Sequence, residues 1–174
     1  MHQWAAMTTS LVMTLLGPDR PGLVELVSTA VAEHDGNWLE SRMSRLSGQF
    51  AGILRIECPS TAADALAARL RDLSSEGIAV QVIVESTVEP GPRVEVTIDV
   101  VGNDRPGIVR RLAAAVAAAG GNVEELATRL ESAPMAGHPL FHASGRVSLQ
   151  ADADPASLAT AIEDLGEDLS VRVQ

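Results

Sequence analysis

Two segments of the chain carry apolar residues at every second position, a period of two that predicts β-strands with one buried face. Their apolar positions are Leu11, Met13 and Leu15, then Val94, Val96, Ile98 and Val100. Each segment is followed by apolar residues spaced three or four apart, which predicts an amphipathic helix packed on a sheet. These helical positions are Leu23, Val24, Val27, Ala30 and Val31, then Ile108, Val109, Leu112, Ala115 and Val116. Because equivalent helical positions differ by 85 residues, the chain contains an internal repeat.

The remaining elements are also predicted twice. Residues 38–46 and 50–58 read as a strand and its return strand, as do 123–130 and 141–149. A second helix follows in each copy, with apolar positions at Leu66, Leu70 and Leu73, then at Leu158, Ile162 and Leu165. Each copy ends in a strand, 78–84 or 169–173. The order in both halves is therefore βαββαβ.

This pattern predicts the α+β class, with two ferredoxin-like domains. Each domain is expected to hold a four-stranded antiparallel sheet with two helices on one face. The predicted bounds are 8–87 for the first domain and 93–174 for the second. Residues 88–92 contain Pro90, Gly91 and Pro92, so they are predicted to be a linker.

The repeat is most exact at a strand-to-helix turn, Asp-Arg-Pro-Gly, at residues 19–22 and 104–107. The first amides of a helix lack internal acceptors and carry the positive end of its dipole, so this turn suits a bound carboxylate or phosphate. Proline is expected in the first helical turn, and glycine lets a ligand approach the backbone. The alternative is a plain helix start, in which each aspartate caps its helix.

A second repeated pair, Gly-Asn, follows each first helix at residues 36–37 and 121–122. Its glycine is predicted to supply the left-handed residue that ends the helix, and its asparagine to open the next strand. The asparagine is therefore the second repeated polar residue, although it could serve only as a turn cap.

Charge and composition exclude several classes of protein. The formal net charge is −10 and the 13 basic residues are all arginine, so direct nucleic-acid binding is not expected. No apolar run is long enough to cross a membrane, and the N-terminus lacks the features of a leader, which favours a cytoplasmic protein. The single cysteine, Cys58, is predicted to be a buried, inert thiol.

No catalytic or metal-binding pattern is found. The second copy carries six extra residues in its hairpin, with His138 and His142 four apart, but Pro139 lies between them and no further ligand joins them. No Ser/His/Asp ordering or glycine-rich phosphate loop is present either. We therefore expect no metal, no cofactor and no enzymatic activity.

The βαββαβ order, the Asp-Arg-Pro-Gly turn and the Gly-Asn pair resemble the ACT domain, a ferredoxin-like regulatory module that commonly binds amino acids. Two such units over residues 8–174, with no attached catalytic or helix-turn-helix domain, resemble the glycine cleavage system transcriptional repressor group. The resemblance implies a ligand at an interface between ACT units, near the turn before the first helix. It implicates Asp19, Arg20, Pro21, Gly22, Leu23 and Asn37 in the first copy, and Asp104, Arg105, Pro106, Gly107, Ile108 and Asn122 in the second.

In these positions, amides around Gly22 or Gly107 would hold a carboxylate, and Asp19 or Asp104 would accept from an ammonium. The resemblance thus implies a non-catalytic regulator that binds an amino acid, with glycine and serine as candidates, and modulates a protein partner such as a transcription factor. The alternative is a regulatory subunit of an amino-acid metabolic enzyme. A homodimer is expected because a lone four-stranded sheet has exposed edges.

Overall fold

The computed structural model describes residues 7–85, 91–132 and 139–174. The chain divides into two compact units, Met1–Val88 and Glu89–Gln174. Most of the predicted linker, residues 88–90, lies outside the described residues, as does His138.

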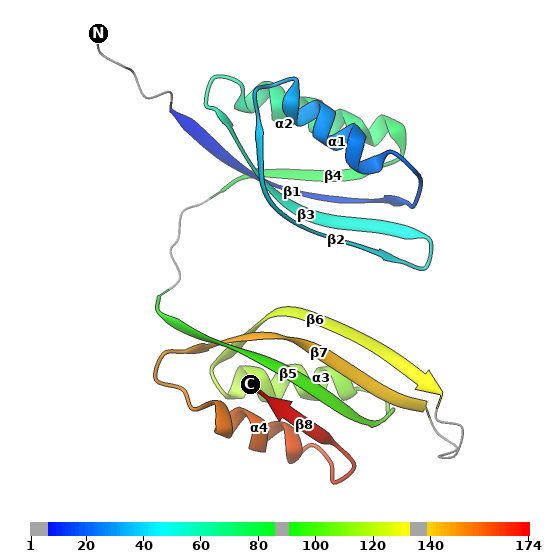
Figure 1. The fold of residues 1–174 in the computed structure, drawn as a ribbon, viewed down its shortest axis with the longest axis vertical. Coiled ribbons are helices and arrows are strands. Elements are labelled where there is room, and N and C mark those ends of the chain that lie inside the picture. Colours follow the sequence, from blue (N-terminus) through cyan, green and yellow to red (C-terminus); the bar gives the residue numbers. More distant parts are fainter. Residues whose placement is uncertain (1–6, 86–90, 133–138) are drawn as a thin grey trace. The chain divides into compact units, whose positions relative to one another are not determined.

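The first unit holds four strands, two α-helices and one short 3₁₀ helix (Figure 1). These are β1 (Thr8–Pro18), α1 (Leu23–Ala32), β2 (Asn37–Leu46), β3 (Gln49–Pro59), α2 (Ala63–Arg71), the 3₁₀ helix η1 (Asp72–Glu76) and β4 (Ala79–Val84). The apolar spacing predicted that the second helix extends to Leu73. In the structure α2 ends at Arg71, and Leu73 lies in η1.

The described residues of the second unit repeat this order without a 3₁₀ helix. Its elements are β5 (Arg93–Asn103), α3 (Ile108–Ala118), β6 (Gly121–Ser132), β7 (Pro139–Gln150), α4 (Pro155–Glu163) and β8 (Ser170–Val173). The strands β6 and β7 reach Ser132 and Pro139, which pair with each other, so the six extra residues of this copy partly lengthen the hairpin.

Both sheets have the predicted topology. Their strand orders are β2-β3-β1-β4 and β6-β7-β5-β8, and every neighbouring pair is antiparallel. Figure 1 shows both helices of a unit on the same face of its sheet. The expectation of two ferredoxin-like βαββαβ domains is therefore confirmed.

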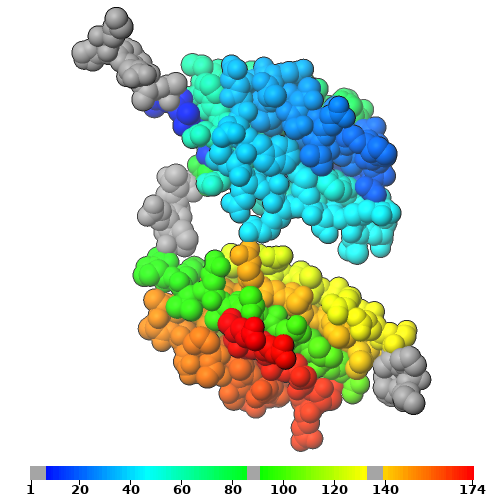
Figure 2. Space-filling model, in the orientation of Figure 1, coloured from blue at the N-terminus to red at the C-terminus, as the bar shows by residue number. Residues whose placement is uncertain are grey.

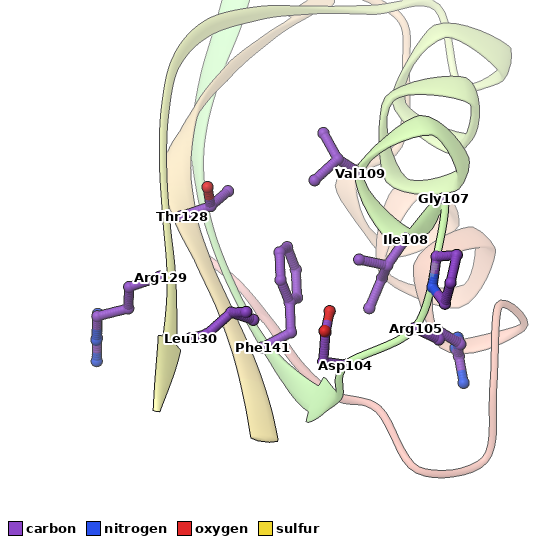
Figure 3. Close-up of a pocket in the computed structure, with 10 residues that line it drawn as sticks. Asp104, Arg105, Gly107, Ile108, Val109, Thr128, Arg129, Leu130 and Phe141 are labelled. Carbon is purple, nitrogen blue, oxygen red and sulfur yellow. The ribbon is translucent and has the colours of Figure 1, made fainter. Parts of the chain in front are cut away.

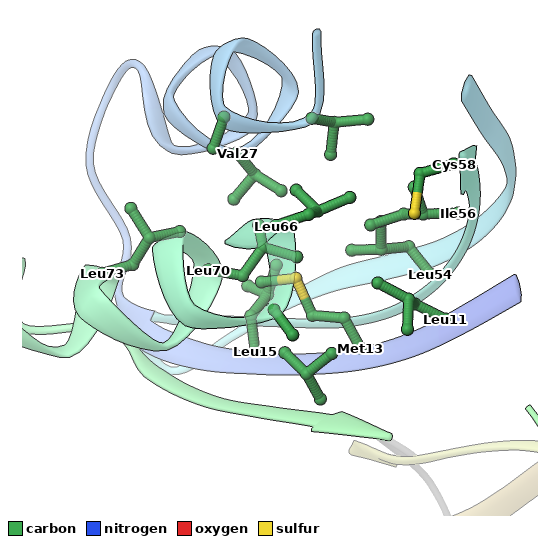
Figure 4. Close-up of a cluster of buried hydrophobic side chains, with 14 of the residues drawn as sticks. Leu11, Met13, Leu15, Val27, Leu54, Ile56, Cys58, Leu66, Leu70 and Leu73 are labelled. Carbon is green, nitrogen blue, oxygen red and sulfur yellow. The ribbon is translucent and has the colours of Figure 1, made fainter. Parts of the chain in front are cut away.

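Each unit has its own hydrophobic core between the sheet and its helices. In the first unit, alternate residues of β1 and β3 meet the inner faces of α1 and α2, as Figure 4 shows for Met13, Leu54 and Leu66. Cys58 belongs to this core and is 1% exposed, as predicted. Its pKa is raised, first by burial and then by the nearby Glu57 carboxylate, which keeps the thiol protonated and unreactive.

Strand register places each Asp-Arg-Pro-Gly turn beside the hairpin of its unit. Gly17, just before the first turn, pairs with Phe50, and the amide of Asp19 donates to the carbonyl of Gly48 at 2.9 Å. Figure 2 shows the blue residues of this region beside the cyan hairpin. In the second unit the amide of Asp104 donates to the carbonyl of Pro139 at 3.0 Å. The end of the hairpin can therefore supply side chains to whatever occupies the turn.

The predicted positions of proline and glycine in the turns need correction. Helices α1 and α3 begin after their prolines, at Leu23 and Ile108, so Pro21 and Pro106 precede the first helical turn. The N-cap residues are Gly22 and Gly107, with φ of 87° and 80°, and neither helix has a side-chain cap. The alternative in which the aspartates cap these helices is therefore wrong.

The glycine of each Gly-Asn pair is not the left-handed residue. That conformation belongs to the residue before it, Asp35 with φ of 54° and Gly120 with φ of 71°. Gly36 is required for close packing instead, because a Cβ there would lie 2.8 Å from the carbonyl oxygen of Val31. A glycine in this position lets the strand leave the helix end without a clash.

Two positions predicted to face the core are exposed. Val24 and Val109, equivalent residues in α1 and α3, are 45% and 41% exposed, whereas Leu23 and Ile108 beside them are buried. Both valines lie next to the repeated turn, so an apolar surface is present there in each unit. Among the described residues, no helix is long and apolar enough to cross a membrane.

Candidate functional site

The turn of the second unit opens into a cavity of about 510 Å³. It lies between the start of α3 and the end of the β6–β7 hairpin (Figure 3). Its lining residues are Asp104, Arg105, Pro106, Gly107, Ile108, Val109, Thr128, Arg129, Leu130 and Phe141. Five predicted site residues of this copy, 104–108, are thus gathered around one cavity.

The side chains around this cavity divide into a polar edge and an apolar wall. Figure 3 shows Asp104 beside Phe141 and Ile108, and Val109 and Leu130 on opposite sides of the opening. Phe141 is 4% exposed, whereas Leu130 is 58% exposed, so the floor is buried and the rim is open to solvent. The Asp104 carboxylate makes no hydrogen bond or ion pair with the side chains or backbone of residues 7–85, 91–132 and 139–174.

Arg105 points away from the cavity and fastens the turn to the rest of the unit. Its Nη1 lies 2.8 Å from Oδ1 of Asp168, and its Nη2 donates to the carbonyl of Leu165 at 2.9 Å. The amide of Asn103 also donates to Asp168, at 2.9 Å. The repeated arginine therefore holds the loop before the last strand against the turn. These contacts give the Arg105 guanidinium a structural role in the turn and not a role in binding a ligand.

In the first unit the turn arginine, Arg20, makes a contact like that of Arg105, but the turn aspartate, Asp19, is paired with a cation. Nη2 of Arg20 donates to the carbonyl of Glu76 at 3.0 Å, which joins the turn to the end of η1, shortly before the last strand. Asp19, however, forms an ion pair with Arg45 of β2, with Nε 2.6 Å from Oδ2. A smaller cavity of about 290 Å³ remains beside Asp19, Gly22, Leu23 and Phe50.

The two predicted asparagines lie away from the turns of their own units. Asn37 and Asn122 are at the start of the second strand, beyond the C-terminal end of α1 or α3. A helix of 10 residues, the length of α1, spans about 15 Å, so Asn37 cannot share a small ligand with Gly22 of the same unit.

Asn122 instead joins a polar network on its own sheet. Its Nδ2 donates to Oε1 of Glu124 at 2.9 Å, and the buried hydroxyl of Ser148 donates to the same oxygen at 2.5 Å. The bond from Ser148, followed by that from Asn122, lowers the pKa of Glu124. Arg93 completes the network by donating to Ser148 at 3.0 Å. The side-chain amide of Asn122 thus has a hydrogen-bond partner in its own unit and needs no ligand to explain its position.

Sequence reasoning missed the contribution of the hairpin to the site. Thr128, Leu130 and Phe141 line the second cavity, and Phe50 lines the first. Phe50 and Phe141 are the two phenylalanines of the chain, and each is the first residue of the predicted return strand of its copy. An aromatic residue at the same position of both hairpins, each facing a repeated turn, is the signal that could have identified them.

No metal centre is found in the described part of the chain, where no three His, Cys, Asp or Glu residues are grouped. Nε2 of His142 lies 3.1 Å from Oε2 of Glu131, and Nε of Arg129 lies 2.7 Å from Oε1 of the same carboxylate. This cluster contains one histidine and one carboxylate, which is too few ligands for a metal site.

The contact between Arg105 and Asp168 predicts an acid-sensitive second unit. Hydrogen bonding from Arg105, and then from the amide of Asn103, lowers the pKa of Asp168. A carboxyl whose pKa is lower in the folded state stabilises the fold above its unfolded-state pKa, and this stabilisation is lost as the pH falls through the folded value. We expect the stability to decrease below about pH 4, the usual pKa of aspartate.

The measurement is denaturant unfolding between pH 3 and pH 7 for the wild type and for Asp168→Asn. The variant should be less stable at pH 7 and should lose less of its stability on acidification. Equal losses in the two proteins would show that the ion pair does not contribute to acid sensitivity.

The comparisons with known proteins agree with this architecture. Residues 9–83 match the family model for the ACT domain. The glycine cleavage system transcriptional repressor of Escherichia coli strain K12 is 28% identical over 166 residues, which cover 93% of this chain and 86% of that protein.

Two solved structures resemble the whole chain. An unknown protein from Galdieria sulphuraria has a TM-score of 0.79 at 29% identity, with 97% of this chain and 98% of that chain covered. A candidate glycine cleavage system transcriptional repressor has a TM-score of 0.70 at 18% identity, with the same coverage, and supports the fold alone.

Proposed function

We propose that this chain, whose residues 9–83 match the ACT domain model, is a non-catalytic regulatory protein that binds an amino acid and signals its presence to a protein partner. The observation that carries the proposal is the cavity at the Asp-Arg-Pro-Gly turn of the second unit. It combines an exposed carboxylate, the start of a helix and an apolar wall, which are complementary to the three parts of an amino acid.

The ammonium group of the ligand would bind Asp104. A charge-assisted hydrogen bond to a carboxylate is stronger than one between neutral groups, and Asp104 has no competing partner among the described residues. The site is also open enough for a ligand to enter from solvent, because Asp104 and Gly107 are exposed.

The carboxylate of the ligand would bind the first turn of α3. The amide of Ile108 already donates to the carbonyl of Arg105 at 3.2 Å, but the following amides, of Val109 and Arg110, have no acceptor within the helix. Gly107 presents no side chain, and a Cβ there would meet nothing within 4 Å, so the backbone is accessible. The helix dipole adds to the attraction of an anion at this end.

The transmission of the signal requires a protein partner. The Escherichia coli relative is named as a transcriptional repressor, which favours a transcription factor or another regulator as the partner of this chain. The net charge of −10 argues against direct contact with nucleic acid. Affinity purification with and without amino acids tests this proposal, and recovery of an amino-acid metabolic enzyme would support the alternative role of regulatory subunit.

We also propose that the chain forms a homodimer. Strands β2 and β6 are long edge strands, of 10 and 12 residues, and exposed edges favour pairing with another chain. In a dimer, Asn37 or Asn122 could approach a turn of the partner copy, which would give the asparagines the ligand role that they lack within one unit. Light scattering that detects only the 18.2 kDa chain at working concentrations would refute the dimer.

Replacement of Asp104 with asparagine tests the binding site directly. We expect at least a tenfold loss of affinity, because the amide oxygen accepts only a neutral hydrogen bond from the ligand ammonium and no longer offers it a negative charge. Wild type at ten times the dissociation constant should gain about 1.4 kcal/mol of stability, and the variant at the same concentration much less. Isothermal titration calorimetry and thermal unfolding against the twenty amino acids provide the measurement.

The matched control is Asp19→Asn, at the equivalent position of the first unit. Asp19 is already paired with Arg45, so its replacement should change ligand affinity little. Wild-type affinity in Asp104→Asn would place the ligand elsewhere. Replacement of Gly22 or Gly107 is a poorer test, because both glycines have positive φ and any side chain there would strain the turn.

A further inference from the structure

The two copies of the turn carry different side chains around the same backbone. Arg45 of β2 pairs with Phe50, and at the equivalent place in the second unit Leu130 of β6 pairs with Phe141. Arg45 reaches Asp19, with Nε 2.6 Å from its Oδ2, whereas the aliphatic Leu130 cannot bond to Asp104. The hairpin therefore neutralises the carboxylate of the first turn, whereas its described residues supply no ion-pair partner to the carboxylate of the second turn.

The first helical turn also carries a charge that disfavours a bound carboxylate in the first unit but not in the second. Glu25, the third residue of α1, lines the first cavity, so its carboxylate repels that of a ligand at this helix start. Arg110 is the equivalent residue of α3, whose first turn contains no acidic residue. A cation at this end of a helix is opposed by the dipole. A bound carboxylate would relieve that opposition in the second unit.

The apolar wall of the second cavity is more extensive than a ligand without a side chain requires. Ile108, Val109, Leu130 and Phe141 all line it, from both α3 and the hairpin (Figure 3). Val109 and Leu130 are 41% and 58% exposed, so they would gain burial from an apolar group placed between them. The hairpin of the first unit carries Arg45 at the position of this leucine, and the first cavity is smaller, about 290 Å³ against 510 Å³.

We infer that only the second unit binds the amino acid, and that this ligand has an aliphatic or thioether side chain, such as that of leucine, isoleucine or methionine. The inference rests on the proposed function and specifies the ligand of that site. The ligand ammonium pairs with Asp104, its carboxylate meets the start of α3, and its side chain lies between Val109 and Leu130 above Phe141. Glycine and serine, which the family resemblance first indicates, leave this wall in contact with water.

The first experiment is calorimetric titration of the full chain with leucine, isoleucine, methionine, glycine and serine. We expect one binding event per chain. Leucine should bind about 10 to 100 times more tightly than glycine, because each fully buried methylene contributes roughly a factor of four and this rim remains partly open.

The second experiment transfers the side chain of one copy to the other. Leu130→Arg should place a guanidinium beside Asp104, as Arg45 is placed beside Asp19, and should lower leucine affinity at least tenfold. Because Leu130 is largely exposed, circular dichroism and the unfolding midpoint should remain close to those of the wild type. The matched variant Arg45→Leu should leave the stoichiometry at one, since Glu25 still opposes a carboxylate in the first unit.

The outcomes separate this inference from the proposed function. Glycine or serine binding as tightly as leucine would overturn the selectivity, and two ligands per chain or an unaffected Leu130→Arg variant would overturn the single site. Either result leaves an amino-acid-binding protein. Failure of all twenty amino acids to bind would overturn both proposals.

Discussion

Replacement of Leu158 with alanine is expected to lower the free energy of unfolding of the second unit by about 2 to 5 kcal/mol. Leu158 is on the inner face of α4 and is 0% exposed within the core of that unit. Its truncation removes apolar burial and leaves a cavity that the surrounding side chains can fill only in part. A loss of this size is comparable to much of the total stability of a small domain.

Urea unfolding followed by circular dichroism and by proteolysis of each unit provides the measurement. Leu66→Ala, the equivalent change in the first unit, should have a similar cost there, because Leu66 is also 0% exposed. Leu130→Ala is the surface control and should change stability by less than about 0.5 kcal/mol, since Leu130 is 58% exposed. A Leu158→Ala protein as stable as this control would show that α4 does not pack as described.

Replacement of Gly145 with valine is expected to destabilise the second sheet by about 3 kcal/mol, the upper part of the usual range for overpacking. A Cβ at this position of β7 would clash with the backbone oxygen of Glu125, far inside van der Waals contact. The pairing of β6 with β7 shifts register between Val123 and Glu125, which brings this carbonyl toward Gly145. Because the conflicting atom belongs to the backbone, the strand must move to relieve the clash.

The control for this prediction is Gly91→Ala, since a Cβ at Gly91 would meet nothing within 4 Å. Its stability should remain near that of the wild type. The measurement is again denaturant unfolding, supplemented by amide exchange along β6. Wild-type protection of β6 in Gly145→Val would contradict the expectation, because the clash should loosen that strand.

The fold was predictable from sequence because each element carries a local signal and each signal occurs twice. Leu11, Met13 and Leu15 alternate in β1, and all three are buried against the helices. The equivalent β5 positions Val96, Ile98 and Val100 are likewise buried, but Val94 before them is 39% exposed. Periodicity identifies the buried face of a strand, whereas the helices determine how far along the strand that face is covered.

The backbone conformation of the turns was harder to predict from the sequence. The sequence indicated that glycine matters at Gly22 and Gly36, but assigned the left-handed conformation to Gly36, when it belongs to Gly22 and Asp35. Composition alone does not separate a glycine needed for positive φ from one needed for close approach. That distinction depends on which atoms the neighbouring elements bring within reach.

The sequence by itself determined the two βαββαβ units, their cores and the positions of the repeated Asp-Arg-Pro-Gly turns, because these follow from local periodicity and from comparison of the two copies. Only the tertiary structure decided which residues share a site. It directed Arg105 toward Asp168, placed Asn122 beyond the far end of α3, and brought Leu130 and Phe141 to the turn. These relations depend on strand register, which joins residues distant in sequence. In the same way, register paired Asp19 with Arg45, whereas Asp104 has no such partner in the described part of the chain, a difference that separates two turns of identical sequence.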